Sequence, residues 1–265
     1  MKKSGFNKRL KSMFAVDTRR MFTTPLYYIL VGICLVVPIL ILVMTSMMDG
    51  TTSIDPQTGK ETVIEGFDNV WQIIGSTSAE SQSQGMNMSL TGMCNINMLY
   101  FFVAVLVCVF VADDFRSGYA KNLFAVRSSK KEYIASKTIV CFIGGASMII
   151  AFFIGSMLGG KMVNLSFDTG SAGVYGIIMC MLSKILLVAI FVSIFVLASV
   201  FAKQKLWLSI ILSLCIGMLF FTIIPIISPL DAGILNVIMC VGGGALFAVG
   251  FGALSNLVLN KKDIL

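Results

Sequence analysis

A segment with the glycine and lysine pattern of a nucleotide-binding loop, GSMLGGKM, runs from Gly155 to Met162. In a P-loop the lysine contacts phosphate oxygens, and the serine or threonine after it holds magnesium. Met162 occupies that last position and has no oxygen to offer the metal. The segment also ends an apolar run instead of joining a strand to a helix. We therefore interpret Gly155 and Gly159 as a GxxxG pair that lets two helices approach closely, and we expect no ATP-binding fold in this chain.

Lys184 is the one charged residue well inside an apolar run. It lies about 15 Å from the start of that run at a rise of 1.5 Å per residue. A lysine near the bilayer centre costs roughly 2.5–3.5 kcal/mol on insertion. Two interpretations follow: a contact for the substrate, or a structural lysine whose long stem reaches the outer interface. A catalytic pair with Ser183 is disfavoured, because adjacent residues point apart on a helix.

Few other residues offer catalytic or metal chemistry. The chain has no histidine, the commonest general base and metal ligand. Its cysteines form no CxxC pair, and all but one fall in apolar segments, where cysteine packs as a small hydrophobic residue. We expect no disulfide, no metal site, no bound cofactor and no enzymatic activity in this chain. The cysteines are Cys34, Cys94, Cys108, Cys141, Cys180, Cys215 and Cys240, of which Cys94 lies in a polar loop.

The composition is that of a membrane protein. Hydrophobic residues make up 57% of the chain and charged residues only 12%, about half the charged share of a soluble domain. The net charge of +7 lies beside apolar runs, where membrane topology requires it, so it does not indicate nucleic-acid binding. We predict a single transmembrane domain over residues 1–265.

The apolar runs predict an all-α integral membrane protein, since about 20 apolar residues cross the hydrocarbon core as a helix. Pro38 and Pro225 lie inside the first and fifth runs and can kink their helices. No predicted span contains a carboxylate, which argues against an ion-coupled carrier. The six predicted spans lie near residues 26–47, 98–112, 138–158, 174–202, 206–228 and 234–258.

The lysine and arginine residues predict the orientation. Seventeen of twenty lie in the N-terminal segment, the loop between spans two and three, the turn between spans four and five, and the C-terminal tail. Lys60 and Lys161 are the two on the opposite side. The positive-inside rule therefore places both termini in the cytoplasm. It makes residues 1–24 a cytoplasmic segment, 113–137 a cytoplasmic loop and 48–97 an extracellular loop.

Three further patterns predict helix surfaces. Residues 6–21 form an amphipathic helix whose basic side suits anionic headgroups, although Asp17 interrupts its apolar face. FDNVWQII, residues 67–74, predicts a short helix resting on the outer interface, or alternatively a lid over an exit path. A row of small residues in the sixth span, Gly244, Ala248 and Gly252, indicates helix packing either within the monomer or between subunits.

The 113–137 loop carries an apolar stripe within its charges. Phe115, Tyr119, Leu123 and Val126 share one face of a helix at their spacing, and Ser129–Glu132 fits a capping box that starts the next helix. Such an amphipathic helix can lie on lipid or dock into a groove of a cytoplasmic protein. The basic residues beside the stripe are Arg116, Lys121 and Arg127.

The loop and the six spans together resemble the permease subunits of ABC type-2 exporters. That family shows an acidic residue, then Gly-Thr, an apolar run, a Pro-x-Ser-Arg-like turn and a lysine before span three. Here Asp114 stands for the usual Glu, Tyr119 for Thr, and residues 125–126 lack the proline. The matching positions are Asp114, Gly118, Leu123, Phe124, Arg127, Ser128 and Lys137.

The resemblance implies a membrane subunit that pairs with a second permease copy, as a homodimer or heterodimer, and with cytoplasmic ABC ATPases that bind ATP and magnesium. It implies a coupling helix in the 113–137 loop, a bacterial plasma-membrane location, and export of an amphipathic peptide, drug or lipid, including resistance to antimicrobial peptides. The alternative is a non-transporting sensor or scaffold partner of an ATPase. The predicted ATPase-docking residues are Asp114, Phe115, Arg116, Gly118, Tyr119, Lys121, Leu123, Phe124 and Arg127, and Lys184 is the candidate substrate contact.

Overall fold

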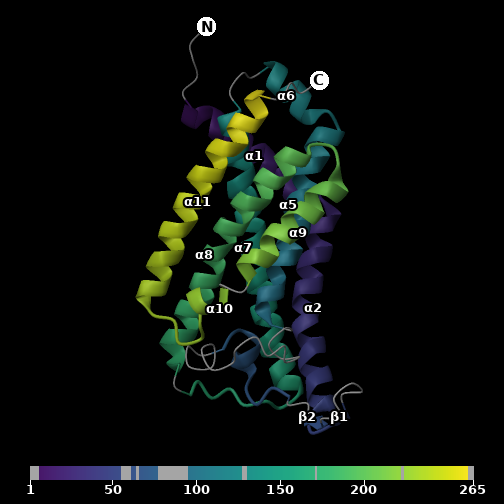
Figure 1. The fold of residues 1–265 in the computed structure, drawn as a ribbon, viewed down its shortest axis with the longest axis vertical. Coiled ribbons are helices and arrows are strands. Elements are labelled where there is room, and N and C mark those ends of the chain that lie inside the picture. Colours follow the sequence, from purple (N-terminus) through teal and green to yellow (C-terminus); the bar gives the residue numbers. More distant parts are fainter. Residues whose placement is uncertain are drawn as a thin grey trace.

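The protein is a bundle of long helices lying side by side (Figure 1). The computed structural model describes residues 6–54, 61–63, 66–76, 95–126, 130–170, 172–221 and 224–261. Five helices in these ranges are long and apolar enough to cross a membrane, which confirms the all-helical membrane architecture. These five are α2 (Pro25–Met48), α5 (Leu99–Arg116), α7 (Lys131–Met162), α8 (Gly173–Ala202) and α11 (Ile234–Lys261). A short 3₁₀ turn, η2 (Ile96–Met98), precedes α5.

The described part of the fifth predicted span contains the helices α9 (Leu206–Phe221) and α10 (Ile224–Ile227). Residues 222–223 between them lie outside the described residues, so the predicted kink at Pro225 stays a prediction. A crossing made by α9 and α10 together stays a prediction.

Basic elements gather at one end of the bundle. Figure 1 shows α6 (Tyr119–Val126) at the same end as the C-terminal part of α11, and the β1–β2 hairpin at the opposite end. The turn between α8 and α9 also lies at the end that carries α6, because Arg116 and Lys121 share a groove there with Lys203 and Lys205. We call this end the basic end. It is the end that the charge distribution predicts to be cytoplasmic.

A small hairpin departs from the all-α prediction. Strands β1 (Thr52–Ile54) and β2 (Glu61–Val63) pair antiparallel within the predicted extracellular loop. The stretch 67–74 also differs from the prediction of an interfacial helix. Its 3₁₀ turn, η1 (Val70–Ile73), is buried against α7, and the Trp71 indole donates a 3.2 Å hydrogen bond to the Phe167 carbonyl.

The glycine pair on α7 packs against α2 as the sequence predicts. A Cβ at Gly155 would lie 2.1 Å from the Leu35 carbonyl oxygen, and one at Gly159 would lie 3.0 Å from the Ile39 Cα. Only glycine permits so close an approach of the two backbones. This confirms the packing interpretation of the GxxxG pair.

In the small-residue row of α11, Gly244 faces α8 and Gly252 faces Ile134 of α7, both within the same chain. A Cβ at Gly244 would lie 3.4 Å from the Ala189 Cβ, at ordinary van der Waals distance. Of the two interpretations, the structure therefore supports packing within the monomer. On other faces of α11, large apolar side chains such as Leu246 and Val249 are exposed, which suits contact with lipid.

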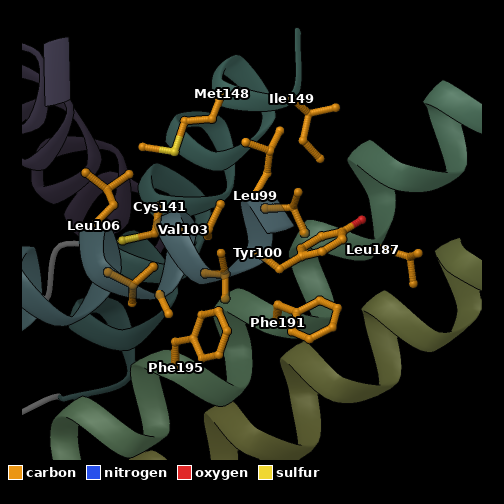
Figure 2. Packing of buried hydrophobic residues seen from close by; sticks show 14 of the residues in the cluster. Leu99, Tyr100, Val103, Leu106, Cys141, Met148, Ile149, Leu187, Phe191 and Phe195 are labelled. Atoms are coloured by element: carbon orange, nitrogen blue, oxygen red, sulfur yellow. The ribbon is translucent and has the colours of Figure 1, made fainter. Parts of the chain in front are cut away.

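The core lies between α5, α7 and α8. The Tyr100 and Phe191 rings stack with centroids 4.4 Å apart, and Phe195 lies 5.8 Å beyond Phe191. Figure 2 shows these rings among buried side chains of α5 and α7, including Val103 and Cys141. The Tyr100 hydroxyl donates a hydrogen bond to the Lys184 carbonyl across the same interface.

Candidate functional site

The predicted coupling helix begins after a sharp break at the basic end. Gly118 adopts φ +75°, a left-handed conformation that residues with a Cβ rarely adopt, and the Ser117 amide closes α5 on the Asp113 carbonyl at 2.8 Å. The chain then forms α6 from Tyr119 to Val126. The break divides the predicted stripe, so that Phe115 belongs to α5 and is buried.

The short helix α6 has a buried face and an exposed face. Ala120 is fully buried, and the Phe124 ring meets Tyr133 of α7 edge-on at 5.2 Å. Lys121 and Ala125 are exposed, and Val126 is 85% exposed. Of the predicted apolar stripe, Phe115 is buried, Tyr119 and Leu123 are half-buried and Val126 is exposed; contact of this stripe with an ATPase stays a prediction. An exposed face of this kind is the part of α6 that can meet another molecule.

A network of buried charges lies beneath α6, between α1 (Phe6–Thr23), α5 and α7. The Lys137 ammonium lies 3.0 Å from the Asp17 carboxylate and 2.7 Å from that of Asp114, and all three side chains are fully buried. The ammonium also lies 3.8 Å from the centroid of the Phe110 ring, a favourable cation–π distance. We call Asp17, Arg20, Asp114 and Lys137 the charge network.

Arg20 completes the charge network from α1. Its guanidinium donates to the other Asp114 oxygen at 2.7 Å and lies 4.3 Å from the centroid of the Tyr119 ring, the first residue of α6. Partial burial lowers the pKa of Arg20, but the charge and hydrogen bond of Asp114 outweigh it and raise the pKa above its ordinary value. The network therefore places two acidic side chains beside two basic ones, and the exposed Asp113 carboxylate lies a further 3.9 Å from the Arg20 guanidinium.

Hydroxyl groups and a second ion pair support this arrangement. Tyr133 donates to Asp114 at 2.9 Å and Ser136 to Asp17 at 2.5 Å, while Arg9 pairs with the buried Glu132 at 3.1 Å. Buried ion pairs repay their desolvation only where such additional partners exist. The three helices α1, α5 and α7 are therefore joined by polar contacts at the point where α6 attaches.

The place of Asp17 in the charge network is not predicted by the sequence, in which this residue only interrupts an apolar helix face. Met13, Asp17 and Met21 form one buried row of α1 that packs on α7. A Cβ at Gly144 of α7 would lie 2.9 Å from the Met21 sulfur. Two features of the sequence could have indicated this ion pair: an acid on an apolar helix face, Asp17, and a lysine at the start of an apolar run, Lys137.

Other predicted docking residues differ in accessibility. Asp114 and Phe115 face the interior, so they position the loop in this structure. Arg116 and Lys121 are exposed, while Gly118, Tyr119, Leu123 and Phe124 are half-buried. Arg127, like Ser128 of the resemblance, lies outside the described residues.

The predicted capping box begins at Ser129, which lies outside the described residues, so it stays a prediction. In the described part, Lys130 occupies the N-cap position of α7 without a side-chain hydrogen bond, and the Glu132 carboxylate pairs with Arg9. The Lys130 ammonium donates to the Leu259 carbonyl at 2.5 Å. The start of α7 is therefore tied to α1 and α11 by side chains.

Lys184 lies toward the opposite end from the charge network and is 1% exposed. Its ammonium lies 3.1 Å from the Asn97 amide oxygen, 3.0 Å from the Ser228 hydroxyl and 3.3 Å from the Ser228 carbonyl. Three acceptors match the three donors of a lysine. These contacts join α8 to η2 and to the end of α10, and they favour the structural interpretation; contact with a substrate stays a prediction.

The comparison with protein families identifies the architecture. The family model described as ABC-2 family transporter protein matches residues 23–220, a range that runs from the end of α1 into α9. The chain belongs to the ABC-2 transporter family. No curated protein and no solved structure matches the permease.

Membership confirms the resemblance seen in the loop and the spans. ABC-2 permeases are the membrane components of transporters, and membership implies association with an ABC ATPase. The charge network and α6 lie within the matched range, apart from Asp17 and Arg20, which precede it. The basic end of this permease is therefore the candidate site of contact with that partner.

Proposed function

We propose that the chain is the permease subunit of an ATP-driven exporter in a bacterial plasma membrane, with its basic end in the cytoplasm. In this proposal α6 is the coupling helix and docks into a cytoplasmic ATPase. A second permease copy completes the transporter. The observation that carries the proposal is the exposed face of α6, which stands on the charge network that joins three helices of the bundle.

The contacts suggest how motion of an ATPase reaches the membrane helices. Force on α6 acts directly on Tyr133 of α7 through Phe124 and on Arg20 of α1 through Tyr119. Asp114, one turn before the break, holds Arg20 and Lys137 together. Because buried ion pairs resist separation, α1, α5 and α7 would tilt as one unit when α6 moves.

We propose an amphipathic cargo, a peptide, drug or lipid, and a role in resistance to antimicrobial peptides. The interior between α5 and α8 is filled by aromatic and aliphatic side chains, and the outer faces of α2, α9 and α11 are apolar. A cargo with an apolar side is compatible with passage along such faces, at the contact between two permease copies.

The test is ATP hydrolysis by the partner in the presence of permease variants. Ala125→Asp places a carboxylate on the exposed face of α6 without disturbing internal packing, and Ala15→Asp makes the same change at an exposed position of α1. We expect Ala125→Asp to abolish stable association and permease-dependent ATPase activity, and Ala15→Asp to retain both. Equal activity of the two variants, at equal membrane abundance, would refute docking through α6.

The sensor or scaffold alternative makes a different prediction. Export by an exporter stops when the partner ATPase is inactivated, whereas a scaffold keeps its output. The measurement is the accumulation of a fluorescent amphipathic peptide in inverted vesicles, with active and inactive partner.

A further inference from the structure

The last helix of the bundle, α11, contributes no side chain to the charge network. It packs along α8, where a Cβ at Gly244 would lie 3.4 Å from the Ala189 Cβ, whereas the charge network draws on α1, α5 and α7. A force that α6 exerts on the charge network therefore reaches α11 only through the packing of intervening helices. The structure also shows a more direct connection, which is made by the residue that precedes α7.

Lys130, at the N-cap of α7, contacts two other helices with one ammonium group. This group donates a 2.5 Å hydrogen bond to the Leu259 carbonyl of α11 and lies 5.7 Å from the centroid of the Phe124 ring of α6. The second distance is within the roughly 6 Å over which a cation is attracted to an aromatic face. The lysine is half-buried, and such an attraction is stronger there than at a fully exposed site. Lys130 therefore joins the predicted coupling helix to the last helix of the bundle.

The carbonyl that Lys130 binds belongs to the last turn of α11, which the structure describes up to Lys261. Carbonyls in the last turn have no amide partner within the helix, and they form the negative end of the helix dipole. A lysine ammonium supplies both a hydrogen-bond donor and a positive charge. The Leu259 side chain is fully buried as well, so this end of α11 is held by packing and by Lys130 together.

The Phe124 ring of α6 connects Lys130 with the charge network. The ring meets Tyr133 edge-on at 5.2 Å, and the Tyr133 hydroxyl donates to Asp114 at 2.9 Å. Displacement of Phe124 therefore acts on Tyr133 and on the Lys130 ammonium at the same time. The first contact leads to α1, α5 and α7, and the second leads to α11.

We infer that Lys130 is a positioning residue, which transmits movement of α6 to α11 and, through the packing of α11, to α8. This inference rests on the proposed docking of α6 into an ATPase. It adds to the charge network a second route by which one short helix moves the bundle. The chain offers a matched control, because the next residue, Lys131, is an exposed lysine at the start of the same helix.

The experiment follows α1 and α11 separately while the transporter binds ATP. An environment-sensitive fluorescent residue is placed at position 253 of α11 or at position 15 of α1, both of which are exposed alanines in the parent chain. Each labelled chain is assembled in membranes with the partner ATPase, association is measured, and fluorescence is recorded before and after ATP is added. We expect the parent chain to respond at both positions.

Removing the ammonium should separate the two responses. Lys130→Met keeps the apolar stem of the side chain, so it should abolish the response at position 253 and retain the response at position 15, where the charge network is unchanged. Lys130→Arg should retain both, since a guanidinium also donates to carbonyls and stacks on aromatic faces. Lys131→Met should retain both as well.

A check of stability separates transmission from folding. Lys130→Met should melt within about 4 °C of the parent chain, because a single hydrogen bond is lost. Lys130→Gln is a second variant, in which a shorter and uncharged side chain replaces the lysine. It should also lose the response at position 253 and retain the response at position 15.

Four results would overturn the inference. They are an unchanged response at position 253 in Lys130→Met, loss of that response in Lys131→Met, loss of both responses in Lys130→Met, and a parent chain that binds the ATPase without any response at position 253. In the last case a response at position 15 would leave the docking of α6 intact. A parent chain that does not associate with the ATPase would refute the proposed function, and the inference would fail with it.

Discussion

The charge network makes a quantitative prediction for Lys137→Met. Methionine fills a similar volume but leaves the buried Asp17 and Asp114 carboxylates facing each other without the cation between them. Breaking a buried ion pair by removing one partner costs about 3–5 kcal/mol. A change of 1 kcal/mol shifts the melting temperature of a chain of this size by about 2–4 °C, so the expected decrease is roughly 6–20 °C.

The assay is thermal unfolding of the purified permease in one detergent, followed by intrinsic fluorescence. Lys131→Met is the matched control, because Lys131 is an exposed lysine at the start of the same helix, and it should change the melting temperature by no more than about 2 °C. Lys137→Met with Asp17→Asn should recover part of the loss, since one of the uncompensated charges is gone. A decrease below 3 °C for Lys137→Met, or no recovery in the double variant, would refute the argument that these charges stabilise each other.

Further predictions concern the close contacts elsewhere in the bundle. Gly155→Ala should destabilise the chain by about 1–3 kcal/mol through overpacking, because the added Cβ would lie 2.1 Å from the Leu35 carbonyl oxygen. The control is Gly32→Ala on α2, where an added Cβ meets open space. This variant should be neutral or stabilising in the same melting assay. Lys184→Met should lower the melting temperature by a few degrees, because leaving the Asn97 and Ser228 groups unpaired costs about 1–3 kcal/mol. It should leave coupled ATP hydrolysis intact. Loss of coupled hydrolysis at unchanged melting temperature would instead support a substrate contact. Gly118→Ala should lower both the melting temperature and ATPase association, because φ is +75° at this position. Wild-type values for both would contradict the left-handed break between α5 and α6.

The membrane architecture was predictable because it depends on composition along short stretches. Apolar runs of sufficient length and the positions of lysine and arginine require no knowledge of tertiary contacts. The GxxxG pair was also predictable, since the spacing of Gly155 and Gly159 itself places two small residues on one helix face.

The charge network was not predictable in the same way. Asp17, Asp114 and Lys137 come from three helices separated by up to 120 positions, and only their packing shows that they neutralise each other. The predicted stripe does not lie on one helix, because helical periodicity assumes a continuous helix, whereas the break at Gly118 separates Phe115 on α5 from Tyr119 and Leu123 on α6. The stretch 67–74 was placed at the interface because its apolar face has two possible partners, lipid and protein, and periodicity does not distinguish them.

The central claim, that α6 docks into an ATPase, is tested most directly by photo-crosslinking in membranes. A photoreactive residue at position 125 of α6 is compared with one at position 15 of α1, with the partner ATPase present and ATP added. We predict a covalent adduct with the ATPase from position 125 and none from position 15. Adducts only with lipid or with a second permease copy from position 125 would contradict the claim.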